Sequence, residues 1–136
     1  MSRKSKGLNA ERDLVRAFWA RGWAAIRSAG SGSSHYPSPD LLVGKEGRRL
    51  AIECKLTSDD KKYLSKEEIE QLRYFSQLFG AETWVAVKFS GLEWHFILPE
   101  DMVQTPRSYA IGKEQIQEKG ISLEEFFTLH HACKKE

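Results

Sequence analysis

Three acids and a lysine are the residues of this sequence whose types and spacing could do chemistry. Asp40 stands at the start of one apolar segment, and Glu53 and Lys55 lie two residues apart in the next. The short turn KEGR separates the two segments and predicts a hairpin. If Gly44 faces Arg49 across that turn, then Asp40 faces Glu53, with their Cβ atoms about 4.5–5.5 Å apart.

Two carboxylates this close repel each other, and they persist where a cation or a shared proton neutralises them. Lys55 would project from the same face of the sheet as Glu53. If the pairing of the two hairpin strands is shifted by one or two residues, the two acids lie instead at a solvent-exposed edge. The sequence alone does not decide between these two registers. The apolar neighbours of the acids are Leu41, Val43, Leu50 and Ile52.

A further acid, Glu11, is predicted to face the core of a helix. It falls within the apolar arc of that helix and not on the polar side with Asp13 and Arg16. Such an acid is costly to bury alone, so it needs a partner, for example Arg12 or Arg27. The apolar arc consists of Leu8, Leu14, Val15, Phe18 and Trp19.

Three inward carboxylates beside a lysine suit the hydrolysis of a phosphodiester. Oxygen ligands favour a hard cation, and we expect Glu11, Asp40 and Glu53 to bind Mg²⁺, with Mn²⁺ as a substitute. The cation would lower the pKa of bound water, while an ammonium group stabilises charge on the phosphorus. The polar loop before Asp40 supplies Ser31 and Ser33, whose hydroxyl and N–H groups can contact phosphate oxygens.

The elements that must position these residues are predicted from apolar periodicity and from signals at helix ends. Ser65 with Glu68 and Ser122 with Glu125 form capping boxes. The order is a helix, three strands, a helix, two strands and a short helical tail, which gives a mixed sheet flanked by helices. The predicted helices are 8–22, 65–80 and 122–132, and the predicted strands are 23–27, 40–44, 49–57, 83–89 and 93–98.

The composition predicts one domain, residues 1–136, in the cytoplasm. The chain is 40% hydrophobic and 29% charged, as in ordinary globular proteins. Cys54 and Cys133 have no metal or redox spacing and suit a reducing compartment. No apolar run approaches the roughly 20 residues of a membrane span, and the N-terminus lacks the apolar segment of a signal peptide.

Basic residues concentrate near the N-terminus. Residues 1–27 carry seven Lys and Arg against two acids, although the net charge is only +2. This asymmetry favours a polyanionic partner, with Arg3, Lys4 and Lys6 in a flexible basic arm, residues 1–7, that contacts phosphates. Solvated lysines at a flexible terminus are the alternative interpretation.

Two other kinds of site fit the polar loop poorly. GSGSSH lacks the third glycine and the following helical pattern of a dinucleotide-binding loop. Ser31, His35 and Asp40 lie within ten residues of one another, whereas hydrolase triads assemble from distant segments. We therefore expect neither site.

Pro39-Asp40 followed by Glu53-Cys54-Lys55 resembles the PD-(D/E)xK nuclease signature. AERDLVRAFWARGWAAIRSAGS, YLSKEEIEQLRYFSQLFG, WVAVKF and WHFI resemble the archaeal Holliday junction resolvases over nearly the whole chain. The resemblance implies an α/β fold with a restriction-endonuclease-like core, namely a mixed five-stranded sheet flanked by helices. It also implies a chromosome-associated homodimer that resolves four-way DNA junctions by paired, symmetric, Mg²⁺-dependent phosphodiester hydrolysis.

The resemblance assigns roles to residues position by position. The loop before the site is longer than in the shortest relatives, and its tip, Ser34–Ser38, receives no role. The metal-site acids are Glu11, Asp40 and Glu53, the catalytic lysine is Lys55, the catalytic loop serine is Ser31, and the basic residues beside the site are Arg12 and Arg27.

Partner surfaces are predicted at two places. Two symmetric cuts need two sites and one chain supplies one, so Phe75 and Phe79 could pack across a two-fold axis. Packing of these two rings under the sheet is the alternative. Leu123–Phe127 faintly resembles a box that binds sliding clamps, but Gly120 stands in place of the usual glutamine, so packing of a terminal helix is favoured.

Two other functions remain open on the sequence. One is a PD-(D/E)xK restriction or repair endonuclease that acts on other DNA structures, because such enzymes share the same site residues. The other is a DNA junction binder without catalysis, which is disfavoured because the three acids and Lys55 are all present.

Overall fold

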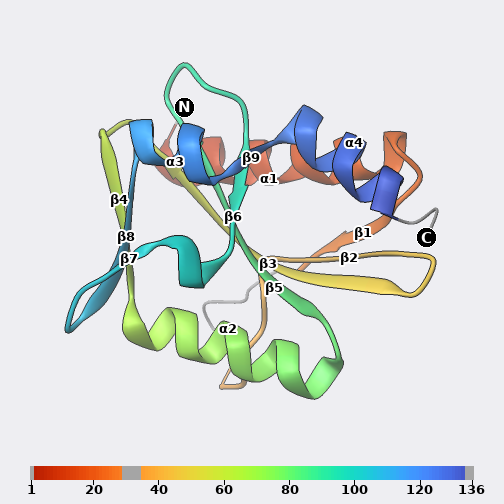
Figure 1. Ribbon diagram of the computed structural model, residues 1–136, viewed down its shortest axis with the longest axis horizontal. Helices are drawn as coiled ribbons and strands as arrows, with labels where there is room; N and C mark the ends of the chain where they lie inside the picture. The colour runs from red at the N-terminus through yellow and green to blue at the C-terminus, as the bar shows by residue number, and fades with distance from the viewer. Residues whose placement is uncertain (1, 29–34, 134–136) are drawn as a thin grey trace.

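The structure is a computed structural model that describes residues 2–28 and 35–133 (Figure 1). Helices α1 and α4 cover one face of a six-stranded sheet, and α2 and a three-stranded sheet lie on the other. The helices are α1 (Arg3–Ala20), α2 (Lys66–Phe79), the 3-10 helix η2 (Pro99–Asp101), α3 (Lys113–Lys119) and α4 (Leu123–Cys133). The strands are β1 (Ala24–Arg27), β2 (Leu41–Lys45), β3 (Arg48–Thr57), β4 (Lys61–Ser65), β5 (Glu82–Phe89), β6 (His95–Ile97), β7 (Val103–Gln104), β8 (Ser108–Gly112) and β9 (Ile121–Ser122).

Helix α1 begins earlier than its apolar periodicity predicts. The Ser2 hydroxyl accepts a hydrogen bond from the Ser5 N–H at 3.1 Å, which caps the first turn. Residues 3–7, predicted as a flexible arm, are therefore helical. None of the helices in the described residues has the length and apolar character that crossing a bilayer requires.

Both predicted capping boxes are confirmed. The Ser65 hydroxyl accepts from the Glu68 N–H at 3.0 Å, and the Glu68 carboxylate accepts from the Ser65 N–H at 3.0 Å. Ser122 and Glu125 make the same pair of bonds at 3.1 and 3.2 Å. Gly80 ends α2 with a φ of 79°, a left-handed conformation that favours glycine.

The prediction of a five-stranded sheet is wrong by one strand. The order is β1-β2-β3-β5-β6-β9, and within the described residues every neighbouring pair is antiparallel except β3 and β5. Strand β9 adds to β6 through only two residues, Ile121 and Ser122. So short a segment has no alternation to detect, and only its second residue, Ser122, falls within the predicted last helix.

The predicted register of the central hairpin is confirmed. Leu41 faces Ile52 and Gly44 faces Arg49. Lys45 also pairs with Arg48, so the loop has two residues and not the four predicted. Its two residues, Glu46 and Gly47, have φ angles of 46° and 88°, the left-handed conformations of a tight hairpin turn.

The second sheet, in the order β4-β8-β7, was not predicted from the sequence. In β4 only Leu64 is buried, and its neighbours include two lysines, so no apolar alternation marks the strand. Strand β4 pairs with β8 from a distant part of the chain, which no local pattern reveals. Helix α3 has seven residues, too few for a clear helical period.

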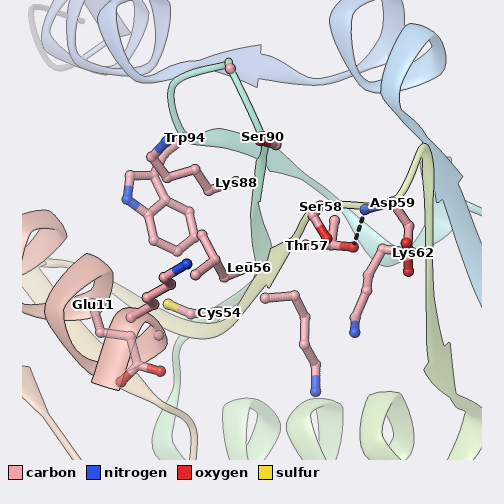
Figure 2. A pocket seen from close by; sticks show the side chains of 14 residues that line it. Glu11, Cys54, Leu56, Thr57, Ser58, Asp59, Lys62, Lys88, Ser90 and Trp94 are labelled. Carbon is pink, nitrogen blue, oxygen red and sulfur yellow. Dashed lines mark hydrogen bonds between the residues drawn. The ribbon is translucent and has the colours of Figure 1, made fainter. Parts of the chain in front are cut away.

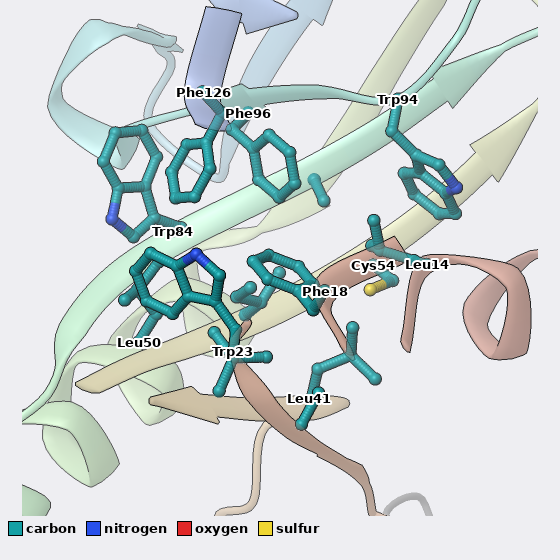
Figure 3. Close-up of a cluster of buried hydrophobic side chains, with 14 of the residues drawn as sticks. Leu14, Phe18, Trp23, Leu41, Leu50, Cys54, Trp84, Trp94, Phe96 and Phe126 are labelled. Atoms are coloured by element: carbon teal, nitrogen blue, oxygen red, sulfur yellow. The ribbon is translucent and has the colours of Figure 1, made fainter. Parts of the chain in front are cut away.

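Aromatic rings hold α1 and α4 against the sheet (Figure 3). The Phe18 ring lies edge-on to the rings of Trp23, Phe96, Phe126 and Phe127, with centroids 5.3–6.0 Å apart. Because Phe126 and Phe127 are buried, they are not exposed to a partner. The favoured packing of the last helix is thus confirmed for Phe126 and Phe127, and their burial argues against the sliding-clamp interpretation of Leu123–Phe127.

Trp19 departs from the predicted apolar arc of α1. Its side chain is 57% exposed, and its indole Nε1–H donates to the Ala25 carbonyl oxygen at 2.9 Å. The arc is narrower than predicted, and Leu14 and Phe18 are its buried members.

The aromatic cluster predicts a large loss of stability when its central ring is removed. Phe126→Ala should lower the free energy of unfolding by about 3–5 kcal/mol, because it leaves a cavity among buried rings. Urea unfolding would measure the change. Val103→Ala, on a side chain that is 45% exposed, is the control and should cost about 0.5 kcal/mol or less. Equal losses for the two variants would contradict this packing.

Candidate active site

The candidate site lies where the pairing of β2 with β3 stops. Ile52 faces Leu41, the first residue of β2, while β3 continues to Thr57 alongside β5. Beyond this point the Asp40 carboxylate accepts a hydrogen bond from the Cys54 N–H at 2.8 Å. A side chain thus satisfies a backbone donor of β3 that no longer faces a strand partner in β2, and this bond fixes Asp40 beside the strand.

Glu53 and Asp40 form a tight acidic pair. Burial, and then the negative charge of Asp40 and a hydrogen bond between the two side chains, raise the pKa of Glu53 to about 8. The Glu53 side chain is only 19% exposed. At neutral pH the pair therefore holds a proton, which a bound cation would displace.

Glu11 reaches this pair from α1, on the other side of the sheet edge. Burial and the charge of Asp40 raise the pKa of Glu11, while Arg27 and Lys55 oppose the rise. The nearest oxygen of Glu11 lies 3.9 Å from a guanidinium nitrogen of Arg27. The prediction that Glu11 faces inward is consistent with its half-buried position.

Lys55 lies between acids of two elements. Its Nζ donates to Glu68 of α2 at 2.6 Å and lies 3.7 Å from Glu53. Burial alone would lower the pKa of Lys55, but the hydrogen bond and charge of Glu68, with the charges of Glu53 and Asp40, raise it. Lys55 is therefore an ammonium group throughout the physiological pH range.

A cavity of about 530 Å³ opens beside these residues and runs along the end of β3. Figure 2 shows Glu11 from α1 and Lys62 from β4 on opposite sides of this strand. Four lysines line the cavity, namely Lys6, Lys55, Lys62 and Lys88. Their positive charge suits an anionic chain that would lead past the acids.

The acids have the donor chemistry of a hard-cation site. They supply carboxylate oxygens only, and burial together with the negative charge of Asp40 raises the pKa of Glu53. Among the described residues, no three His, Cys, Asp or Glu side chains already form a closed set of ligands. Asp40 and Glu53 would have to exchange their shared proton for the cation.

Of the other predicted site residues, one lines the cavity, some lie elsewhere on the helices, and some fall outside the described part of the chain. Lys4 and Arg12 are exposed on α1, and Lys6 lines the cavity. Phe75 and Phe79 stack on each other with centroids 5.4 Å apart on α2. Ser31, Ser33 and the loop-tip residue Ser34 lie outside the described residues, and the side chain of Arg3 is not described.

Several residues around the site were not predicted to belong there. Glu68 was identified only as part of a capping box, although it also contacts Lys55. Lys62 and Lys88 enter the cavity from β4 and β5. Lys62 lies in a strand that the sequence did not reveal, so no local pattern could have found its place.

Comparisons with known proteins agree over most of the chain. The model of the family described as archaeal Holliday junction resolvase (Hjc) matches residues 2–135. The chain is 41% identical over 122 residues to the crossover junction endodeoxyribonuclease Hjc of Archaeoglobus fulgidus, which covers 90% of this chain and 89% of that protein. It is 41% identical over 108 residues to the protein of the same name from Methanocaldococcus jannaschii, covering 79% and 77% of the two chains. The structure of Archaeoglobus fulgidus Hjc, a Holliday junction resolvase, matches with a TM-score of 0.81 at 37% identity, over 89% of this chain and 99% of that one.

The raised pKa of Glu53 predicts that the metal-free protein loses stability as the pH rises. The ordinary pKa of the group is 4.5 and the folded value is about 8, so between them only the folded state keeps the proton. The stabilisation that the retained proton gives the folded state is fully present below pH 4.5. It falls by up to about 1.4 kcal/mol per pH unit between pH 4.5 and about 8.

Urea unfolding in EDTA at pH 5 and pH 8 would measure this effect. Glu53→Gln carries no titrating group, so it should be more stable than the wild type at pH 8, with little difference at pH 5. Glu70→Gln, on an exposed residue of α2, is the control and should follow the wild type. A Glu53→Gln curve parallel to that of the wild type would contradict the shared proton.

Proposed function

The chain belongs to the archaeal Holliday junction resolvase family, and we propose that it is an endodeoxyribonuclease that resolves four-way DNA junctions. The observation that carries the proposal is the meeting of Glu11, Asp40, Glu53 and Lys55 at one sheet edge. These residues come from α1, the start of β2 and the middle of β3. Within a single nuclease domain with a restriction-endonuclease-like core, they form the active site.

Glu11, Asp40 and Glu53 hold Mg²⁺, or Mn²⁺ in its place. The buried acid pair with its shared proton supports this assignment, because a divalent cation would relieve the repulsion. When bound, the ion supplies a polarised water and stabilises charge on the phosphate. Asp40 is held in place by its bond to the Cys54 N–H.

Lys55 contributes a permanent positive charge beside the reacting phosphate. Its ammonium lies 3.7 Å from Glu53, close enough to face a phosphate oxygen bound at the acids. Arg27, beside Glu11, adds a second cation at the rim of the site. Ser31 is proposed as the loop residue that contacts the same phosphate.

The DNA backbone follows the lysine-lined cavity to the acids. Lys6, Lys62 and Lys88 face this path, and their contacts neutralise phosphates without reading bases. Recognition then depends on backbone geometry, which suits a junction on the chromosome. Further contacts are proposed for Arg3, Lys4, Arg12 and Ser33.

A second copy of the chain binds through α2. Four residues in its C-terminal half are aromatic or apolar, and Leu78 and Phe79 are 72% and 48% exposed. Tyr74 is also exposed, and Phe75 is half-buried against the core under the sheet. Paired cleavage of two strands requires two sites, which a symmetric dimer through this surface supplies.

Catalysis and binding should separate in site variants. Asp40→Asn, Glu53→Gln and Lys55→Ala should each lower the cleavage rate of an immobile four-way junction by orders of magnitude in Mg²⁺. Junction affinity should stay within a few-fold of the wild type, because phosphate contacts elsewhere dominate binding. Single-turnover cleavage and gel-shift titration at fixed salt would measure both. Full activity of Asp40→Asn would contradict the assigned site.

Dimer and substrate are tested together by the cleavage pattern. The wild type should sediment at about twice the mass of one chain and nick opposing strands at symmetry-related positions, leaving ligatable duplexes. Phe79→Glu should yield monomers that lose this paired cutting, whereas Val103→Glu on the small sheet should not. Sequencing gels would compare junction with linear duplex. Equal cutting of plain duplex would favour a restriction or repair nuclease, and junction binding without cutting would favour a non-catalytic binder.

A further inference from the structure

Glu68 uses its two carboxylate oxygens for two different elements. Oε1 accepts from the Ser65 N–H at 3.0 Å and completes the cap of α2. Oε2 accepts from Lys55 Nζ of β3 at 2.6 Å. The Glu68 side chain therefore fixes both the first turn of α2 and the ammonium group of Lys55.

A second capping box in the same chain shows that this double use is not required for capping. Glu125 accepts from the Ser122 N–H at 3.1 Å, and the Ser122 hydroxyl accepts in return. The Glu125 side chain is exposed, and no Lys or Arg ion pair with it is found in the described part of the chain. The contact of Glu68 with Lys55 is thus additional to its capping role.

The position of Lys55 needs such an anchor. A lysine side chain is long and flexible and carries a compact charge. Lys55 has negative groups on two sides, with Glu53 at 3.7 Å and Glu68 at 2.6 Å. Without Glu68, the ammonium would be drawn onto the pair of Glu53 and Asp40, where it would compete with a divalent cation for the same oxygens.

We propose that Glu68 is a positioning residue, which holds the Lys55 ammonium on the α2 side of the site and leaves Glu53 and Asp40 open to the metal ion. This inference rests on the proposed nuclease function. It adds that the cap of α2 and the placement of the site lysine depend on one carboxylate.

Glu68→Gln is the variant that tests this role. The amide keeps an oxygen for the Ser65 N–H and places N–H donors, without charge, toward Lys55. Single-turnover junction cleavage should fall by about 10- to 100-fold, as when outer partners of metal-site residues are removed. Junction affinity should stay within a few-fold, and the Mg²⁺ concentration at half-maximal rate should rise several-fold.

Two controls separate positioning from capping. Glu125→Gln makes the same chemical change in the matched box and should leave cleavage unchanged. Ser65→Ala removes the hydroxyl that caps α2 but keeps Glu68 and Lys55, so it should lower the thermal midpoint while retaining most of the cleavage rate. Glu68→Asp, which retains the charge on a shorter side chain, should recover part of the rate lost in Glu68→Gln.

Binding of Mn²⁺ in the absence of DNA, followed by electron paramagnetic resonance, gives a readout that does not depend on cleavage. Glu68→Gln should bind Mn²⁺ several-fold more weakly than Glu125→Gln. Equal Mn²⁺ affinities and equal cleavage rates of these two variants would overturn the inference. A wild type that binds Mn²⁺ but does not cleave a junction would overturn the proposed function instead, while the Mn²⁺ comparison would still decide the role of Glu68.

Discussion

Strand β3 loses its partner β2 after Ile52, and the candidate site depends on that interruption. Had the pairing continued, the Cys54 N–H would donate to a backbone carbonyl and the edge of β3 would be closed. Instead the Asp40 carboxylate takes this bond at 2.8 Å. An acid is thereby fixed beside Glu53 at a point where β3 still has β5 on its other side. A rigid sheet thus carries two carboxylates at an open edge, which is the requirement for holding a cation precisely.

Each face of the sheet contributes one further charged group to this edge. Helix α1 supplies Glu11. The position of this helix is fixed by Phe18, which packs among the aromatic rings on the same face of the sheet. Helix α2 supplies Glu68, which its capping box fixes at the first turn. The two hydrophobic cores therefore do more than stabilise the fold. Each core fixes the position of one helix against the sheet and thereby the position of that helix's carboxylate in the site. A shift of either helix by one turn would move its acid by about 5 Å.

The sequence predicted what depends on neighbouring residues and missed what depends on distant pairing. The facing of Asp40 and Glu53 followed from a hairpin whose turn fixes the register within a few residues. Glu11 followed from helical periodicity. No local pattern predicted the second sheet, because β4 and β8 meet from distant segments and only Leu64 of β4 is buried. The contact of Glu68 with Lys55 also joins two elements, and a capping signal already accounted for Glu68 without it.

The charged side chains of the site affect one another's protonation and contacts. Glu53 keeps a proton to a pH of about 8 because it is buried and Asp40 is negative. Lys55 could neutralise that pair, yet its shorter contact is with Glu68. The lysine is thus drawn toward Glu68, and its ion pair with Glu53 is the longer of the two contacts, at 3.7 Å. The acid pair is left with a proton, which a divalent cation would displace on binding. Helix α2 carries Glu68 in its first turn and the exposed Leu78 and Phe79 in its last, so it joins the site to the surface proposed for a second copy of the chain.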